Sequence, residues 1–283
     1  MNDRYFRWRK IRKRDVPAAE TLLRAMEGKY VSACGRFLIR GASGDHVWTL
    51  RGKRGEISGL LVNSRSTLMP VLCGRKEIPL PRFLGGFMRK KNVHSVQGLT
   101  EEVVVLEDAM EQMGRVIADI FDFDLMTIDR QPDPKGFSSG PSNLVLRVPK
   151  LTDLDELAPL QAAYEQEEVL PRGSVFSPAA SRVNISNIIY RGQILAAEIC
   201  GRLVGKINIS AVSFTRYQVG GVYVHPDFRG LGIARRMAAE FIAPLINDGM
   251  GVTLFVKKTN IAARRLYACL GFSVKGDYRI TYY

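Results

Sequence analysis

The sequence lacks the long apolar runs, cysteine spacing and histidine clusters that mark several large classes of protein. It has no stretch of about 18 apolar residues, so no transmembrane helix is expected. The first fourteen residues carry seven Lys and Arg against one Asp but no apolar core, so they do not resemble a secretory signal. Four cysteines without C-x-x-C spacing indicate reduced thiols in a cytoplasmic protein, and three unclustered histidines predict no metal site.

Acidic residues are also scarce relative to basic ones. The chain has 41 Lys and Arg against 28 Asp and Glu, which gives a net charge of +13. Such a surface attracts anions, whether nucleic acid, an acidic protein or the phosphates of a coenzyme. Tyr5, Phe6 and Trp8 lie within the basic N-terminus and offer faces for base stacking. An ordinary opening strand or tail explains them as well, and we expect neither a nucleic acid nor a membrane partner.

The two best-known phosphate-binding motifs, G-x-G-x-x-G and G-x-x-x-x-G-K-[ST], do not account for the glycine-rich loop in the C-terminal half. That loop, RGLGIA at residues 229–234, follows the apolar segment 222–224 and precedes an amphipathic helix. Its glycines allow close backbone approach, and the N–H groups of the first helical turn point at an anion. The loop therefore predicts a phosphate site at the start of a helix.

A second motif follows the predicted strand Val252–Val256. In NIAARRLYACLGF at residues 260–272, Asn260 is a good N-cap and Gly271 occupies the position where a helix needs a left-handed residue. Asn260 and Tyr267 are seven positions apart, so they lie on one face of the helix, two turns apart.

Together these motifs resemble the GNAT superfamily of acyl-CoA N-acyltransferases, over residues 144–283. Arg229, Gly232 and Ala234 fit its R/Q-x-x-G-x-G/A loop, and residues 260–272 fit its N-x-x-A-x-x-L-Y-x-x-x-G-F segment. The resemblance implies that acetyl-CoA is a co-substrate, that no metal is required, and that the strand before the loop pairs with the pantetheine arm. The residues expected to bind the coenzyme are Val222, Tyr223, Val224, Arg229, Gly230, Leu231, Gly232, Ile233, Ala234, Arg235 and Asn260.

The chain is predicted to contain three parts. Residues 131–143 hold three prolines, two glycines and three serines, which is typical of a linker. Residues 144–283 read as strand, two helices, a hairpin, a central strand, the loop and its helix, a strand, the second-motif helix and a final pair of strands. Residues 1–130 repeat part of that order but lack the loop. We expect an α/β (α+β) fold of two tandem GNAT-like domains, each a mixed, mostly antiparallel sheet flanked by helices. Residues 1–130 resemble the divergent GNAT-like module that precedes a GNAT domain in some bacterial fusion proteins, and the alternative is an unrelated accessory domain.

The chemistry of direct acyl transfer needs a held thioester, a neutral amine and a stabilised leaving thiolate. The resemblance implies that the Tyr267 phenol donates to the coenzyme sulfur; a tyrosine packed in the core is the alternative. An alkyl ammonium must lose a proton, and a carboxylate usually assists. The candidates for this base are Glu167 and Glu168 first, with Glu165, Glu198 and His225 as weaker ones.

The function that these patterns favour is an N-acetyltransferase that moves an acetyl group from acetyl-CoA to a primary amine. The amine belongs to a protein lysine or N-terminus, or to a small metabolite, and the sequence leaves this open. The alternative is a non-catalytic protein that senses CoA or another ligand, with nucleic acid on its basic N-terminus. Monomer and homodimer also remain open.

Overall fold

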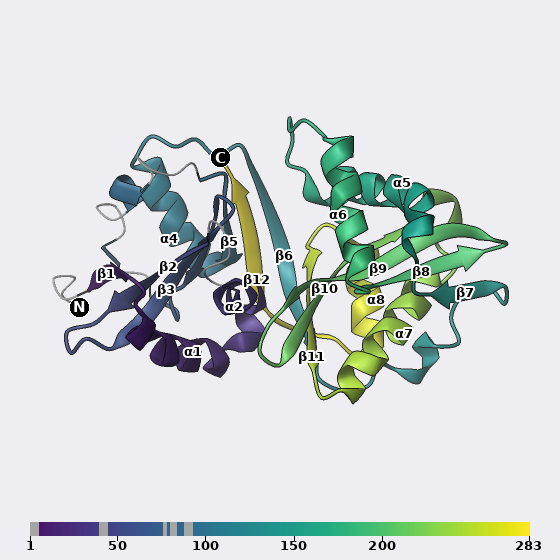
Figure 1. Cartoon of the computed structure of the whole chain (residues 1–283), viewed down its shortest axis with the longest axis horizontal. Helices are drawn as coiled ribbons and strands as arrows, with labels where there is room; N and C mark the ends of the chain where they lie inside the picture. Colours follow the sequence, from purple (N-terminus) through teal and green to yellow (C-terminus); the bar gives the residue numbers. More distant parts are fainter. Residues whose placement is uncertain (1–5, 40–44, 76–77, 80–83, 88–92) are drawn as a thin grey trace. The chain divides into compact units, whose positions relative to one another are not determined.

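The computed structural model describes residues 6–39, 45–75, 78–79, 84–87 and 93–283 (Figure 1). The chain divides into two compact units, one of residues 1–125 and 275–283, the other of residues 126–274. These bounds differ from the predicted domains, because the last strand of the chain belongs to the first unit.

The sheet of the first unit is mixed. Its strands follow the order β1-β2-β3-β4-β5-β12-β6. Neighbours from β1 to β4 are antiparallel, β4 and β5 are parallel, and β12 is antiparallel to β5. Their bounds are β1 (Arg7–Lys10), β2 (His46–Arg51), β3 (Ile57–Ser64), β4 (Thr67–Val71), β5 (Ser95–Leu99), β6 (Asp119–Ile128) and β12 (Ser273–Tyr282).

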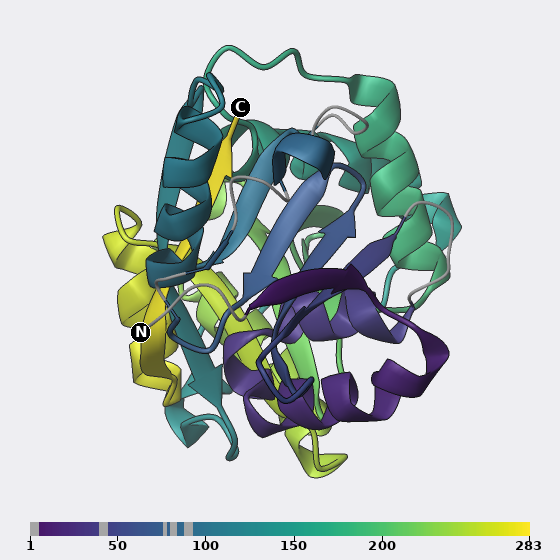
Figure 2. The ribbon, with the colours of Figure 1, turned by 90° about the vertical axis from the view of Figure 1, so that its left-hand side faces the viewer.

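Helices of the first unit pack against its sheet (Figure 2). Leu61 shares an apolar cluster with Val103 and Leu106 of α4 (Thr100–Glu111). The neighbouring residues of β3 point to the opposite face, where α1 (Val16–Ala25) and α2 (Val31–Leu38) contact that strand.

The sequence after Asp15 predicts one helix to about Tyr30, and the structure has a shorter helix there. It ends at Ala25, and a 3-10 turn at Glu27–Lys29 separates it from α2. Gly28 lies in this turn, and glycine is a poor residue for a helix interior. The sequence also predicts a helix over residues 80–91. Residues 84–87 are helical, and the other residues of this range lie outside the described residues.

The sheet of the second unit has the order β6-β11-β10-β9-β8-β7, with the end of β6 contributing. The strands β7 to β10 are antiparallel neighbours, and β10 and β11 are parallel. The elements of this unit are β7 (Leu144–Arg147), α5 (Leu154–Tyr164), a π turn (Glu165–Val169), α6 (Pro178–Tyr190), β8 (Ile194–Ile199), β9 (Arg202–Val212), β10 (Arg216–Val224), α7 (Ile233–Asn247), β11 (Gly251–Lys257) and α8 (Ile261–Leu270).

Helices cover both faces of this second sheet (Figure 1), and each face has its own apolar core. Helices α5 and α6 pack on one face through a cluster that includes Leu160, Ile185 and Leu203. Helices α7 and α8 pack on the other face through a cluster that includes Met237 and Leu270. Helix α7 continues past Pro244 to Asn247, although a proline inside a helix usually kinks or ends it.

The segment predicted as a linker, residues 131–143, lies within the second unit. The Gln131 amide donates to Asn247 Oδ1 at 2.7 Å, and a Cβ on Gly136 would come within 2.8 Å of both Ala239 and Leu270. The segment is therefore packed closely against α7 and α8.

The C-terminus differs from the predicted pair of short strands. Residues 273–282 form one continuous strand, β12, and its second half pairs with β5 from Tyr278↔Leu99 to Tyr282↔Ser95. Tyr278 and Thr281 are buried there. The partner of this strand lies some 180 residues earlier in the chain, which a reading of local pattern does not reveal.

Candidate functional site

The two central strands of the second unit stop pairing halfway along their length. The parallel register between β10 and β11 holds from Arg216↔Gly251 to Gln218↔Thr253 only. Both strands continue beyond that point, to Val224 and Lys257. Beyond Gln218 and Thr253 the two strands are not paired with each other, which leaves backbone groups of β10 available to a ligand.

A bulge in β10 lies just beyond the point of separation. Gly220 pairs with Asn208 and Tyr223 with Lys206, so Gly221 and Val222 together face a single residue of β9. Gly221 has φ +60°, a conformation that favours glycine.

Two side chains hold the bulge at Gly221. Its N–H donates to the hydroxyl oxygen of Tyr164, at the end of α5. Its carbonyl accepts a 2.8 Å hydrogen bond from Lys206 Nζ. A Cβ on Gly221 would overlap the Asn208 amide oxygen and lie 2.9 Å from Lys206 Nζ, so only glycine fits.

Lys206 is fully buried. Its Nζ also approaches Asn208 Oδ1 at 3.3 Å and lies 4.6 Å from the ring centroid of Tyr164. Burial lowers the pKa of the Lys206 ammonium to about 7, although the Glu165 carboxylate favours the charged form. Among the described residues no carboxylate accepts a hydrogen bond from it.

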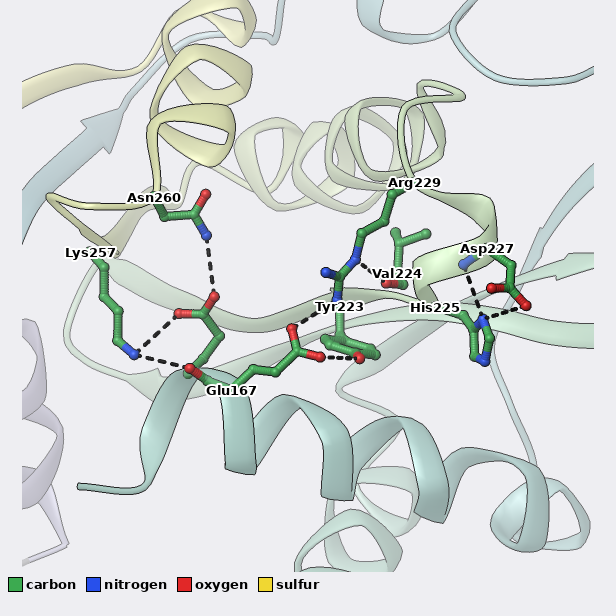
Figure 3. A network of polar contacts seen from close by, with 9 residues as sticks. Glu167, Tyr223, Val224, His225, Asp227, Arg229, Lys257 and Asn260 are labelled. Atoms are coloured by element: carbon green, nitrogen blue, oxygen red, sulfur yellow. Dashed lines mark hydrogen bonds and ion pairs between the residues drawn. The ribbon is translucent and has the colours of Figure 1, made fainter. Parts of the chain in front are cut away.

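The π turn after α5 carries two glutamates to the opposite edges of the separated strands (Figure 3). Glu167 accepts from the Tyr223 hydroxyl at 2.7 Å and from Arg229 Nη2 at 2.9 Å. Arg229 in turn donates to the Val224 carbonyl at 2.9 Å, and its guanidinium lies over the Tyr223 ring. The pKa of Glu167 is lowered. Partial burial alone would raise it, but the hydrogen bonds from Tyr223 and Arg229 together outweigh burial.

Glu168 meets the other edge. Its carboxylate accepts from Asn260 Nδ2 at 3.2 Å and lies 3.5 Å from Lys257 Nζ. Lys257 also donates to the Glu167 carbonyl at 3.2 Å (Figure 3). The π turn therefore connects the ends of the two strands: it contacts Arg229 after β10, and Lys257 and Asn260 at the end of β11.

The glycine-rich loop forms the start of α7, as predicted. Gly232 is its N-cap with φ +79°, and Gly230 has φ +80°. The first backbone hydrogen bond of the helix runs from Arg236 to Gly232, so the N–H groups of Ile233, Ala234 and Arg235 have no partner within the helix. Leu231 is exposed, and Arg235 Nε is buried without a hydrogen-bond partner.

Helix α8 has the predicted caps. Asn260 Oδ1 accepts from the Ala263 N–H at 3.0 Å, and Gly271 ends the helix with φ +100°. Tyr267 lies in the core of the α7–α8 face, 6% exposed, with its ring against Phe272. Burial raises the pKa of Tyr267, and the neighbouring Tyr164 and Glu168 add to this.

Of the weaker base candidates, Glu198 and His225 have other partners, and Glu165 lies near Lys206 but is held by neutral side chains. Glu198 pairs with Arg147 at 2.6 Å at the β7–β8 edge. His225 caps the turn after β10 and accepts from the Asp227 N–H. Glu165 accepts hydrogen bonds from Gln161 and Asn184. The sequence argument missed Lys206 and Tyr164, and the paired glycines 220–221 inside a strand were the one signal of a bulge.

A known protein family matches the part of the chain that holds these residues. Residues 160–272 match the model of the acetyltransferase (GNAT) family. The chain therefore contains a GNAT acetyltransferase domain, and this domain lies in the second unit. Its matched range includes the π turn, the bulge, the glycine-rich loop and α8.

Solved structures resemble nearly the whole chain. A GCN5-related N-acetyltransferase from Sphaerobacter thermophilus shares 21% identity at a TM-score of 0.64, covering 99% of this chain and 96% of that one. A tandem GNAT protein from the clavulanic acid biosynthesis pathway, solved without AcCoA, shares 14% at 0.60, covering 98% and 97%. A GCN5-related N-acetyltransferase-like protein from Streptococcus suis shares 13% at 0.58, covering 95% and 98%. The fold is accordingly one of two tandem GNAT-like domains of mixed α/β structure.

A comparison with curated proteins found no match. Within the described residues, no helix is long and apolar enough to cross a membrane, and no group of three or more His, Cys, Asp and Glu is arranged to hold a metal.

Proposed function

We propose that this protein is an N-acetyltransferase that moves the acetyl group of acetyl-CoA directly to a primary amine. The observation that carries the proposal is the combination of a bulged β10, separated from β11 beyond Gln218, with a glycine-capped helix at the end of the same strand. A separated strand edge accepts an extended amide chain, and a helix N-terminus accepts a pyrophosphate. Both features meet at residues 222–235.

In this proposal the pyrophosphate binds the N–H groups of residues 233–235, and pantetheine lies along residues 222–224. Arg229 and Asn260 are now held by Glu167 and Glu168. The Arg229 and Glu167 side chains are each about half exposed, so their ion pair is weak and opens at small cost when phosphate arrives.

The reaction needs two proton losses from the acceptor nitrogen. The ammonium first gives a proton to a base, and the neutral amine then attacks the thioester carbon. The nitrogen of the tetrahedral intermediate loses its second proton to solvent as the carbon–sulfur bond breaks and CoA leaves as a thiolate. Tyr267 is the proposed donor of a hydrogen bond to the leaving sulfur, and burial keeps its phenol protonated. Glu168 is the preferred base over Glu167, because the lowered pKa of Glu167 weakens it as a proton acceptor.

The proposed acceptor is a primary amine, either of a protein or of a small metabolite. We also propose a cytoplasmic location, because the cysteines are scattered without C-x-x-C spacing. The proposal includes either a monomer or a homodimer.

The test is release of free CoA thiol from acetyl-CoA in the presence of lysine peptides, peptides with a free N-terminus and small primary amines. We expect one acceptor class to release thiol at a rate that saturates with acetyl-CoA. Calorimetry runs in parallel. Tight acetyl-CoA binding without thiol release from any amine would favour the non-catalytic sensor instead, and absence of binding would refute both.

A further inference from the structure

The most unusual group in the second unit is the buried amine of Lys206. Strand residues on both sides of it are apolar or small, and the side chain is fully buried at the bulge rather than in an ion pair. Burying a charged amine without a carboxylate partner is costly. Its position beside the strand separation therefore indicates that Lys206 has a role in the site.

Lys206 and Tyr164 hold the peptides on either side of Gly221. The Lys206 Nζ donates to the Gly221 carbonyl of the Gly221–Val222 peptide at 2.8 Å, while the Tyr164 hydroxyl oxygen accepts from the Gly221 N–H of the preceding peptide. The chain has no cis peptide bond among its described residues, so the Val222 N–H points away from the Gly221 carbonyl and from Lys206. Val222 has no partner in the β9 register.

We propose that Lys206 is a positioning residue for acyl transfer: its ammonium fixes and polarises the Gly221–Val222 peptide, so that the Val222 N–H becomes a stronger donor to the thioester carbonyl oxygen. This rests on the proposed function. A cation at the carbonyl of a peptide strengthens the hydrogen bond that the same peptide donates. Donors aimed at a developing oxyanion have large effects on acyl transfer.

The charge of Lys206 makes the effect depend on pH. The titratable groups that face it are Tyr164 from α5 and Glu165 from the π turn, while β9 contributes the uncharged Asn208 and β10 the Gly221 carbonyl. Lys206 is charged below its pKa, so polarisation is greatest in mildly acidic solution and declines as the pH rises above neutral.

The experiment measures the carbonyl stretching frequency of acetyl-CoA, labelled with ¹³C at the acetyl carbonyl and bound to the full chain, by infrared difference spectroscopy. It needs no acceptor amine. In the wild-type protein we expect the frequency to fall below that of free acetyl-CoA, and to fall further at pH 6 than at pH 9. In Lys206→Met we expect most of the fall to vanish and the remainder not to change with pH.

Two further variants separate position from charge. Lys206→Gln keeps a donor for Gly221 without a charge, so an intermediate, pH-independent fall is expected. Gly221→Ala places a Cβ where Lys206 and Asn208 now lie, so it should displace Lys206 from the Gly221 carbonyl. We expect it to give the result expected of Lys206→Met, and it replaces Lys206→Met if the latter does not fold. Asn208→Ala is the control, because it leaves the Lys206–Gly221 contact in place and should behave as wild type.

A bound acetyl-CoA whose carbonyl frequency is the same in Lys206→Met and wild type would overturn the inference. So would a wild-type shift that does not vary with pH. Acetyl-CoA that fails to bind the wild-type protein in calorimetry is a different result, because it refutes the proposed function rather than the role of Lys206.

Discussion

At the scale of single residues, the site contains two buried groups with opposite consequences. Burial raises the pKa of the Tyr267 phenol and lowers the pKa of the Lys206 ammonium. The phenol therefore stays protonated and able to donate at neutral pH, whereas the amine titrates there. Each group can be tested by a substitution that keeps the volume of its side chain.

Tyr267→Phe should lower kcat and leave CoA affinity nearly unchanged. The hydrogen bond to the leaving thiolate forms only as charge develops, so its loss affects the transition state more than the bound state. A loss within or somewhat below the range of about 10²–10⁴-fold is expected. Asn260→Ala is the comparison, and should weaken CoA binding and cost about 1 kcal/mol through the helix cap. The measurement is kcat of both variants at saturating acetyl-CoA. If chemistry is rate-limiting and Tyr267→Phe keeps the wild-type kcat, Tyr267 is a core residue without a role in protonation.

Lys206→Met should stabilise the unliganded protein, and more so at low pH. The folded-state pKa of Lys206 is about 7, below the ordinary value of a lysine, so above pH 7 the unfolded state binds more protons. Wild-type stability then rises by about 2 to 3 kcal/mol between pH 7 and pH 9 through this group, and the variant lacks that rise. Urea unfolding followed by circular dichroism measures it, with the exposed Lys135→Met as control. Parallel pH curves for Lys206→Met and wild type would show that the amine is not desolvated.

At the scale of elements, the glycine-rich loop and the first turn of α7 form the proposed anion site. Gly232 has φ +79°, and a Cβ there would lie 2.9 Å from the Gly140 backbone nitrogen. The loop can tolerate neither a side chain nor a shift of its backbone without moving the N–H groups that face the phosphates.

Gly232→Ala should therefore weaken CoA binding at least about tenfold, and Gly232→Glu should abolish it by adding negative charge at the pyrophosphate. Gly249→Ala is the matched control. It lies after the other end of α7 with φ +76° and open space for a Cβ, so it carries only the backbone strain, about 1–2 kcal/mol. Calorimetry with CoA separates the two, and equal affinities in Gly232→Glu and wild type would exclude the loop as the phosphate site.

Most elements of the second unit were predictable because each has a strong local signal. Alternating apolar residues mark β8 to β11, and Asn260 and Gly271 mark the ends of α8. Lys206 was not predictable, since a lysine flanked by glycine and isoleucine on a strand resembles a solvent-facing position. The π turn was not predictable either: its run of glutamates resembles an exposed helix face, and its contacts with Arg229 and Asn260 span more than 60 residues of sequence.

At the scale of the whole molecule, two GNAT-like domains share one coenzyme loop. The first unit has no R-x-x-G-x-G/A sequence, and one of its buried carboxylates, Glu102, accepts a hydrogen bond from Tyr30 rather than from a loop arginine. We expect one CoA site per chain. Calorimetric stoichiometry near one, falling to zero in Gly232→Glu, would support this, and a stoichiometry of two in wild type would contradict it.

The last strand adds a constraint on how this protein is made. Between β5 and β6 of the first unit lies β12, whose Arg279 bonds to both Asp122 and Glu107. During synthesis the ribosome releases residues 1–125 long before residues 275–283. Until then the nascent first unit has two unfilled strand edges, which are liable to pair with other chains. The second unit, by contrast, is continuous in sequence and has all its strands once residue 274 has emerged. The first unit therefore completes its sheet only after the whole second unit has been synthesised.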